Sequence, residues 1–114
     1  MVLEGRILTE RGFVEGRLFF SERIEALEET RVEGPYILPG FLDLHVHGGL
    51  GADAMEGKEA VLRMARLHLQ RGTTGLLPTT VTAPPEAIEK ALRGIGEAMA
   101  ECEALLAPTW KAPS

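Results

Sequence analysis

Cysteine and long apolar runs are the first features that this sequence lacks. Cys102 is the only cysteine among the 114 residues, which excludes an intramolecular disulfide and is typical of a reducing compartment, so we expect a cytoplasmic protein. No apolar run approaches the roughly 20 residues of a membrane span, and charges interrupt residues 1–6 before a signal-peptide core could form. The sequence therefore predicts neither export nor a membrane partner.

A long block of charge of one sign is also missing. The chain has 12 Lys and Arg residues against 17 Asp and Glu residues, and its net charge is -5. We therefore expect no nucleic-acid partner and no anionic membrane surface. Asparagine is absent and Gln70 is the only glutamine, a bias that fits a thermophile and also a GC-rich genome.

The length limits the architecture. Hydrophobic residues make up 45% of the chain, charged residues 25%, and the mean hydropathy is +0.02, as in a small soluble globular domain. A closed eight-stranded α/β barrel needs about 250 residues. If barrel chemistry is present, we expect these 114 residues to hold only part of the barrel.

The sequence changes character near Pro39. Before it, short apolar stretches alternate with glycines, the pattern of short strands joined by tight turns. We predict a small β layer over residues 1–36, in which residues 23–29 form a strand or a turn. The first part of the chain is therefore expected to be all β.

After Pro39 the pattern alternates between strand and helix. We predict a strand within residues 36–47, a helix over 58–71, a second strand over 73–82 with Pro78 at a sheet edge or an irregular end, and a second helix from residue 84. A β-α-β-α series implies parallel strands joined by crossover connections. The fold class is therefore α/β.

Two histidines on the first of these strands are the strongest chemical signal. His45 and His47 are two residues apart, so on a strand both imidazoles lie on one face, about 6.6 Å apart along the backbone. Imidazole nitrogen is a good ligand for Zn²⁺ and related metals. Alternation also predicts that Asp43 shares this face and that the opposite face packs into a core; that face carries Leu42, Leu44 and Val46. The alternative is a chance spacing, with one histidine in the core and the other at the surface.

The residues around this pair resemble a known family. Residues 39–47 read Pro-Gly-Phe-Leu-Asp-Leu-His-Val-His, which is similar to the first barrel strand of the amidohydrolase superfamily. Residues 48–53 and 71–84 narrow the resemblance to the N-acetylglucosamine-6-phosphate deacetylase family. The resemblance implies that residues 1–38 are part of a β-sandwich and that residues 39–114 are the first two β/α units of an incomplete (β/α)₈, or TIM, barrel.

The resemblance also implies a chemistry. It predicts a metal-dependent hydrolase that removes acetate from an amino-sugar phosphate, with His45 and His47 as ligands of one or two divalent metal ions, zinc being the expected metal. The family's further ligands and its catalytic Asp lie on later strands, so we expect no catalytic residue within this chain. Two imidazoles are too few for a catalytic zinc, and the truncated chain alone should bind metal weakly and turn over little substrate.

Several neighbouring residues have two explanations each. Asp43 could orient a histidine or support the barrel floor. Gly48 and Gly49 could let substrate approach the backbone, or form a plain tight loop. His68 lies on the apolar side of its helix, where a partly buried histidine that binds no metal is expected. Thr79 ends the second strand, where barrel active sites collect, yet threonine is also a good strand residue.

Two alternative functions stay open. One is a cyclic amidohydrolase of the dihydroorotase or hydantoinase type, although dihydroorotases tend to carry an arginine where Gly48 stands here. The other is a non-catalytic remnant that associates with itself. An open sheet edge and a partial barrel expose apolar surface, so we expect a homo-oligomer.

Overall fold

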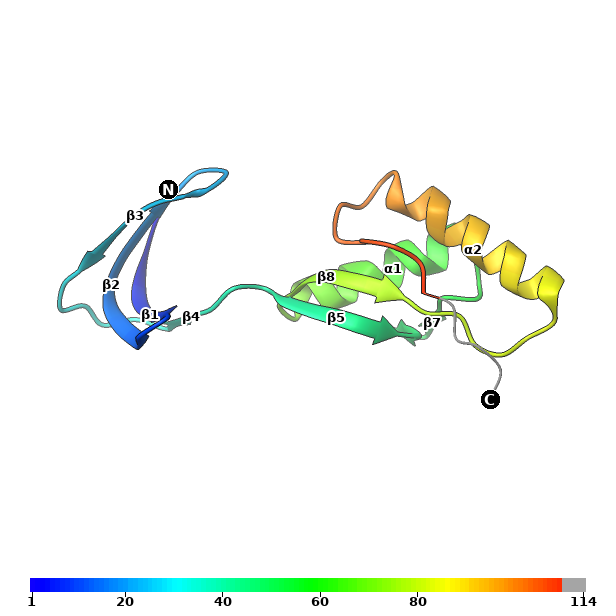
Figure 1. The fold of residues 1–114 in the computed structure, drawn as a ribbon, viewed down its shortest axis with the longest axis horizontal. Helices are drawn as coiled ribbons and strands as arrows, with labels where there is room; N and C mark the ends of the chain where they lie inside the picture. The colour runs from blue at the N-terminus through cyan, green and yellow to red at the C-terminus, as the bar shows by residue number, and fades with distance from the viewer. Residues whose placement is uncertain (110–114) are drawn as a thin grey trace. The chain divides into compact units, whose positions relative to one another are not determined.

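The computed structural model describes residues 1–109 and divides the chain into two compact units, Met1–Pro39 and a second unit that starts at Gly40. The first unit is all β and the second combines helices with parallel strands (Figure 1). This mixed α/β content agrees with the fold class predicted from the sequence. No helix within residues 1–109 is long and apolar enough to cross a membrane.

The first unit is one four-stranded sheet with the strand order β3-β2-β1-β4. The strands are β1 (Val2–Thr9), β2 (Gly12–Phe20), β3 (Ile24–Glu29) and β4 (Tyr36–Ile37). The first three are antiparallel neighbours, and β4 runs parallel to β1. The predicted β layer is confirmed, and β3 shows that residues 23–29 contain a strand.

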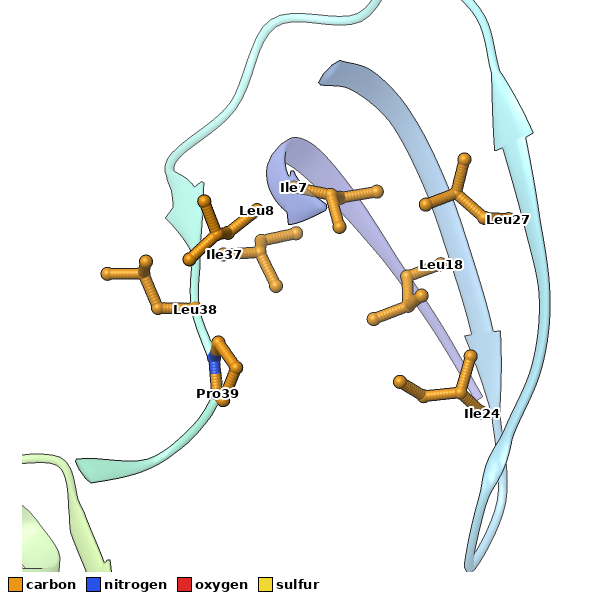
Figure 2. Close-up of a pocket in the computed structure, with 8 residues that line it drawn as sticks. All are labelled: Ile7, Leu8, Leu18, Ile24, Leu27, Ile37, Leu38 and Pro39. Carbon is orange, nitrogen blue, oxygen red and sulfur yellow. The ribbon is translucent and has the colours of Figure 1, made fainter. Parts of the chain in front are cut away.

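The two faces of this sheet differ in chemistry. On one face Arg17 lies between Glu4 and Glu28, with nitrogen–oxygen distances of 2.7 and 3.4 Å. Apolar side chains line a hollow of about 270 Å³ (Figure 2); they belong to Ile7, Leu8, Leu18, Ile24, Leu27, Ile37, Leu38 and Pro39. The sheet therefore has an apolar surface that the described part of this unit leaves open.

The second unit follows the predicted order of strand, helix, strand and helix. Its main elements are β5 (Phe41–Val46), α1 (Lys58–Gln70), β8 (Thr73–Pro78) and α2 (Pro85–Met99), and a small hairpin of β6 (Gly48–Gly49) and β7 (Ala52–Asp53) precedes α1. β5 and β8 pair in parallel. The predicted stretch 36–47 is divided in two, because Tyr36–Ile37 pairs with β1 as β4.

Local signals explain where the helices begin and end. α1 ends at Gln70, and Gly72 follows with φ of 97°, a conformation that favours glycine. α2 begins at Pro85, where the missing N–H costs no helical hydrogen bond, and Glu86 lies in its positive first turn. These boundaries agree with the sequence prediction.

A third parallel segment, residues 105–109, lies beside β8. Leu105 pairs with Leu76 and Thr109 with Thr79, and the Thr109 N–H donates to the Pro78 carbonyl at 2.8 Å. β8 therefore has a neighbour on both sides and ends at Pro78, so the irregular-end explanation of this proline is correct. The sequence analysis did not detect the third segment.

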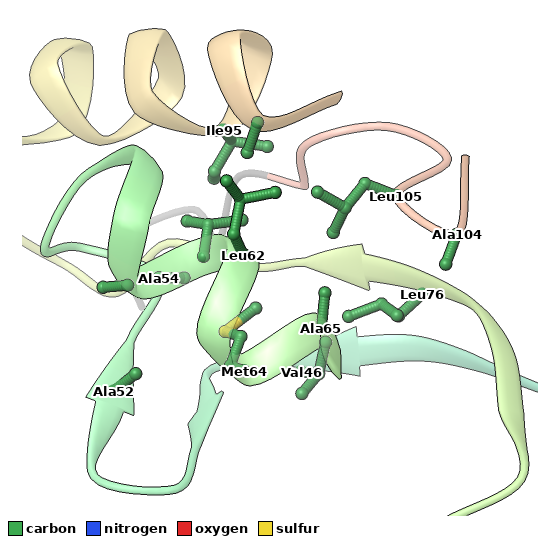
Figure 3. Packing of buried hydrophobic residues seen from close by; sticks show 13 residues of the cluster. Val46, Ala52, Ala54, Leu62, Met64, Ala65, Leu76, Ile95, Ala104 and Leu105 are labelled. Carbon is green, nitrogen blue, oxygen red and sulfur yellow. The ribbon is translucent and has the colours of Figure 1, made fainter. Parts of the chain in front are cut away.

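The core of the second unit lies between the two helices and one face of the parallel strands (Figure 3). Val61 and Met64 from α1, Leu76 from β8 and Ile95 from α2 are fully buried there. Val46 is the only residue that β5 contributes to this core. Burial of these apolar side chains is the main source of stability for this unit.

An irregularity in β5 corrects the predicted alternation. Asp43 pairs with Leu76 and Val46 pairs with Pro78, so three residue steps on β5 match two on β8. An extra residue of this kind reverses the alternation of side chains along a strand. Leu42 and Leu44 are therefore 65% and 63% exposed instead of packed with Val46, and the prediction of one continuous apolar face was wrong.

Candidate metal centre

The two histidine side chains meet at the carboxyl end of β5. Their Nε2 atoms are 3.0 Å apart, and their rings are nearly perpendicular, with centroids 4.7 Å apart. His45 is exposed and His47 is half-buried. The structure thus brings together the two residues that the spacing predicted to converge.

The end of the neighbouring strand fixes the ring of His47. Its Nδ1 lies 2.9 Å from the carbonyl oxygen of Thr79. A carbonyl oxygen only accepts hydrogen bonds, so Nδ1 carries the hydrogen and donates, and the neutral ring keeps a lone pair on Nε2. Metal-binding histidines commonly donate their other ring N–H to a backbone carbonyl in this way.

The donor pair fits half of a metal site. Two nitrogen ligands at tetrahedral angles and zinc distances of about 2.0–2.1 Å are about 3.3 Å apart, close to the separation of the two Nε2 atoms. In the metal-free protein, the same short contact requires that His45 Nε2–H donates to His47 Nε2. No group of three potential ligands of the His, Cys, Asp or Glu type occurs within residues 1–109. Further ligands would therefore have to come from outside these residues.

Asp43 does not contact either imidazole ring. Its Oδ1 accepts a hydrogen bond of 3.1 Å from the backbone N–H of His45. Its partner in the sheet is Leu76, a core residue, and the irregularity in β5 follows between Asp43 and Val46. Asp43 therefore acts on the backbone of the strand, and the structure does not place it on one face with both histidines.

Gly48 and Gly49 form the first strand of the small hairpin. A Cβ on Gly48 would lie 2.2 Å from the carbonyl oxygen of Ala52, and a Cβ on Gly49 would lie 2.9 Å from Leu67 Cδ2. The hairpin is too tight for a side chain at Gly48 without a shift of the backbone. Packing alone therefore accounts for both glycines.

His68 and Thr79 make hydrogen-bond contacts next to the pair. His68 is half-buried and its Nε2 lies 3.1 Å from the carbonyl oxygen of Gly48, and it forms no group of three possible metal ligands within residues 1–109. The role of Thr79 was missed because its backbone carbonyl, not its side chain, makes the contact. Its position at the end of the second strand was the only signal in the sequence.

Comparison with curated protein sequences identifies the proteins that this chain resembles. No protein-family model matches the chain. The chain is 37% identical over 99 residues to N-acetylglucosamine-6-phosphate deacetylase of Mus musculus, a match that covers 77% of this chain and 24% of the mouse protein. It is 36% identical over 100 residues to N-acetylgalactosamine-6-phosphate deacetylase of Escherichia coli, covering 81% of this chain and 26% of that protein. Both relatives are deacetylases of N-acetylated amino-sugar phosphates, and the chain is similar to about a quarter of each.

The chain is also similar to solved structures of N-acetylglucosamine-6-phosphate deacetylase. The fold matches N-acetylglucosamine-6-phosphate deacetylase from Thermotoga maritima with a TM-score of 0.86 and 28% identity, over 99% of this chain and 32% of that chain. The enzyme from Mycobacterium smegmatis matches with a TM-score of 0.81 and 25% identity, over 99% and 35%. The chain is thus similar to a portion of N-acetylglucosamine-6-phosphate deacetylase, consistent with its amino-terminal part, as the resemblance predicted. It spans about a quarter of the length of the curated relatives that it matches.

Proposed function

We propose that the chain supplies the amino-terminal part of a metal-dependent deacetylase of amino-sugar phosphates. In this proposal residues 1–38 are part of a β-sandwich and residues 39–114 begin a (β/α)₈ barrel. β5, β8 and the 105–109 segment support the barrel, since they are parallel neighbours in chain order with one helix between each pair. The apolar hollow of the first unit supports the sandwich, because a second sheet would cover such a face.

The pair of His45 and His47 is the observation that carries this proposal. Both side chains lie at the carboxyl end of a parallel strand, where barrel enzymes place their active sites. A divalent ion held there, zinc for this donor set, supplies Lewis-acid activation of a carbonyl and of water. His45 and His47 would hold the ion, and the contact of His47 Nδ1 with the Thr79 carbonyl leaves the lone pair of the neutral His47 ring on Nε2 for it.

The substrate class follows from the relatives. One solved M. smegmatis deacetylase is a mutant in complex with N-acetyl-D-glucosamine-6-phosphate. The proposed reaction is hydrolysis of the acetamide of N-acetylglucosamine 6-phosphate to acetate and glucosamine 6-phosphate. The described residues provide two ligands and no third, so turnover requires ligands and a proton-transferring carboxylate from outside residues 1–109.

The hairpin after the histidines favours a deacetylase over a cyclic amidohydrolase. An arginine in place of Gly48 would put its Cβ 2.2 Å from the Ala52 carbonyl oxygen, so this hairpin cannot hold the arginine that dihydroorotases tend to carry there. The two glycines therefore support the proposed class.

A cobalt titration of the 114-residue chain tests the metal site. Co²⁺ absorbs visible light when it binds imidazole, and we expect weak binding that is lost in His45→Ala and in His47→Ala. Cys102→Ser is the matched control, because it removes the only thiol that could bind cobalt in their place. Undiminished cobalt binding by both histidine variants would contradict the proposal.

A second candidate function is non-catalytic self-association of the 114-residue chain. It rests on Leu42, Leu44 and Leu106, which are large apolar side chains exposed to solvent in the second unit. The outer edge of β5 also has no strand beside it within residues 1–109. A homo-oligomer would cover both features.

A further inference from the structure

We propose that His68 is a positioning residue, which holds the backbone after His47 so that the histidine pair keeps its geometry. This inference rests on the proposed metal site and adds to it the only other histidine of the chain. His68 lies near the end of α1, 20 residues after Gly48, the residue whose carbonyl oxygen it contacts. It binds no ion itself in this role.

The backbone around His47 is held from three directions. The His47 carbonyl oxygen accepts a hydrogen bond of 2.7 Å from the N–H of Ala54, across the hairpin. The next carbonyl, that of Gly48, lies 3.1 Å from His68 Nε2. On the other side of the strand, the Thr79 N–H donates to the Val46 carbonyl at 2.8 Å. Among these three contacts, the one from His68 is the only one made by a side chain.

The chemistry of the contact fixes which atom of His68 carries the hydrogen. Because the Gly48 carbonyl only accepts, His68 Nε2 is the donor. The lone pair of the neutral ring is then on Nδ1. Within residues 1–109 no group of three His, Cys, Asp or Glu side chains is placed to hold one ion, so the role that we assign to His68 is support of the hairpin and not ligation.

Gly49 provides a second, independent sign that α1 and the hairpin are closely fitted. A Cβ on Gly49 would lie 2.9 Å from Leu67 Cδ2 and 3.1 Å from His68 Nε2, closer than ordinary van der Waals contact. The absence of a side chain lets the helix approach the hairpin until the hydrogen bond to Gly48 can form. Sterics and hydrogen bonding thus favour the same arrangement.

His45 is held less firmly than His47 within residues 1–109. Its backbone N–H donates to Asp43, but its ring is exposed, and the ring of His47 is its one hydrogen-bond partner in this part of the chain. His47 is therefore the preorganised ligand of the pair. Loss of the hydrogen bond from His68 to the Gly48 carbonyl should therefore weaken metal binding, because it loosens the backbone next to His47.

The test compares two variants of the 114-residue chain. His68→Leu removes the donor and keeps an apolar group of similar size, whereas His68→Gln keeps an N–H donor that can reach the Gly48 carbonyl. The first measurement is amide hydrogen exchange of Ala54 without metal, with the Ile95 amide in α2 as a reference for global opening. The second is the affinity for Co²⁺.

For His68→Leu we expect faster exchange of Ala54 relative to Ile95 and a loss of cobalt affinity of about tenfold, the usual effect of removing such a supporting contact. His68→Gln should restore both values. Unchanged Ala54 exchange in His68→Leu, or an equal acceleration of Ala54 and Ile95 that glutamine does not restore, would overturn the proposal. If the unsubstituted chain binds no cobalt, the proposal of a metal site is wrong. The exchange rate of the Ala54 amide in the variants still shows whether His68 positions the hairpin.

Discussion

The Nδ1 of His47 lies 2.9 Å from the carbonyl oxygen of Thr79, 32 residues further along the chain. This contact joins the carboxyl ends of β5 and β8, the two parallel strands that α1 connects. It orients the ring of His47 before any ligand binds, because the carbonyl accepts from only one of the two ring nitrogens. The orientation of the His47 ring in the candidate site therefore depends on the register between the two strands.

The protonation of the rings follows from this contact. When both rings are neutral, we expect His47 to carry its hydrogen on Nδ1 and His45 on Nε2. Long-range ¹H–¹⁵N correlation spectra of the histidine side chains in the metal-free protein measure both. A hydrogen on Nε2 of His47 would show that the Thr79 contact does not persist in solution.

Gly94 and Gly96 lie two residues apart in α2 and should respond in opposite ways to alanine. A Cβ on Gly94 would lie 2.8 Å from the Cα of Gly57, so Gly94→Ala forces the helix away from α1 and should destabilise the unit by about 1–3 kcal/mol. Gly96 has open space, so Gly96→Ala should stabilise by about 0.5–1 kcal/mol through helix propensity. Urea unfolding of both variants measures the free energies, and equal effects would refute the close helix approach.

Leu76 and Leu44 lie on adjacent strands and differ in burial. Leu76 is fully buried between β8 and the helices, so Leu76→Ala should lower the free energy of unfolding by about 3–5 kcal/mol. Leu44→Ala is the control for the same chemical change, and with most of its side chain exposed it should cost under about 1 kcal/mol. A comparable loss in both variants would mean that Leu44 is packed in solution.

Self-association is expected of the 114-residue chain because Leu42 and Leu44 are exposed beside an open strand edge. Sedimentation velocity should show a dimer or larger species, and the double variant Leu42→Glu and Leu44→Glu should shift the protein toward the monomer. Glu97→Gln is the control, because it changes a charge at an exposed position of α2 away from this surface. It should leave the proportions of monomer and oligomer unchanged. A folded monomer at micromolar concentration would argue against the association.

Local signals in the sequence were sufficient for most elements. Glycines separated the strands of the first unit, Gly72 and Pro85 marked a helix end and a helix start, and the His45 and His47 spacing predicted the paired imidazoles. Each of these predictions depends on residues that are close in sequence. The same holds for the resemblance read from residues 39–53, and the relatives confirm the similarity of the chain to the deacetylases.

Three features depended on contacts that are distant in sequence. The 105–109 segment became part of the sheet because Leu76 and Thr79 offer it backbone partners, although its own sequence shows no strand pattern. Gly94 permits the close approach of α2 to Gly57, which lies 37 residues earlier in the chain. The exposure of Leu42 and Leu44 follows from the extra residue in β5, which strict alternation could not predict.

The sequence by itself determined the class of protein, the order of its strands and helices and the two histidines that define the candidate site. These follow from residue spacing, turn residues and motif, all of which are local. Only the tertiary structure decided the contacts around the site: the Thr79 carbonyl accepts from His47 Nδ1, the Gly48 carbonyl accepts from His68 Nε2, and Asp43 accepts from the backbone N–H of His45. The physical reason is that strand register and helix packing determine which backbone carbonyls face a given ring. The spacing of residues along one strand specifies neither the register nor the packing.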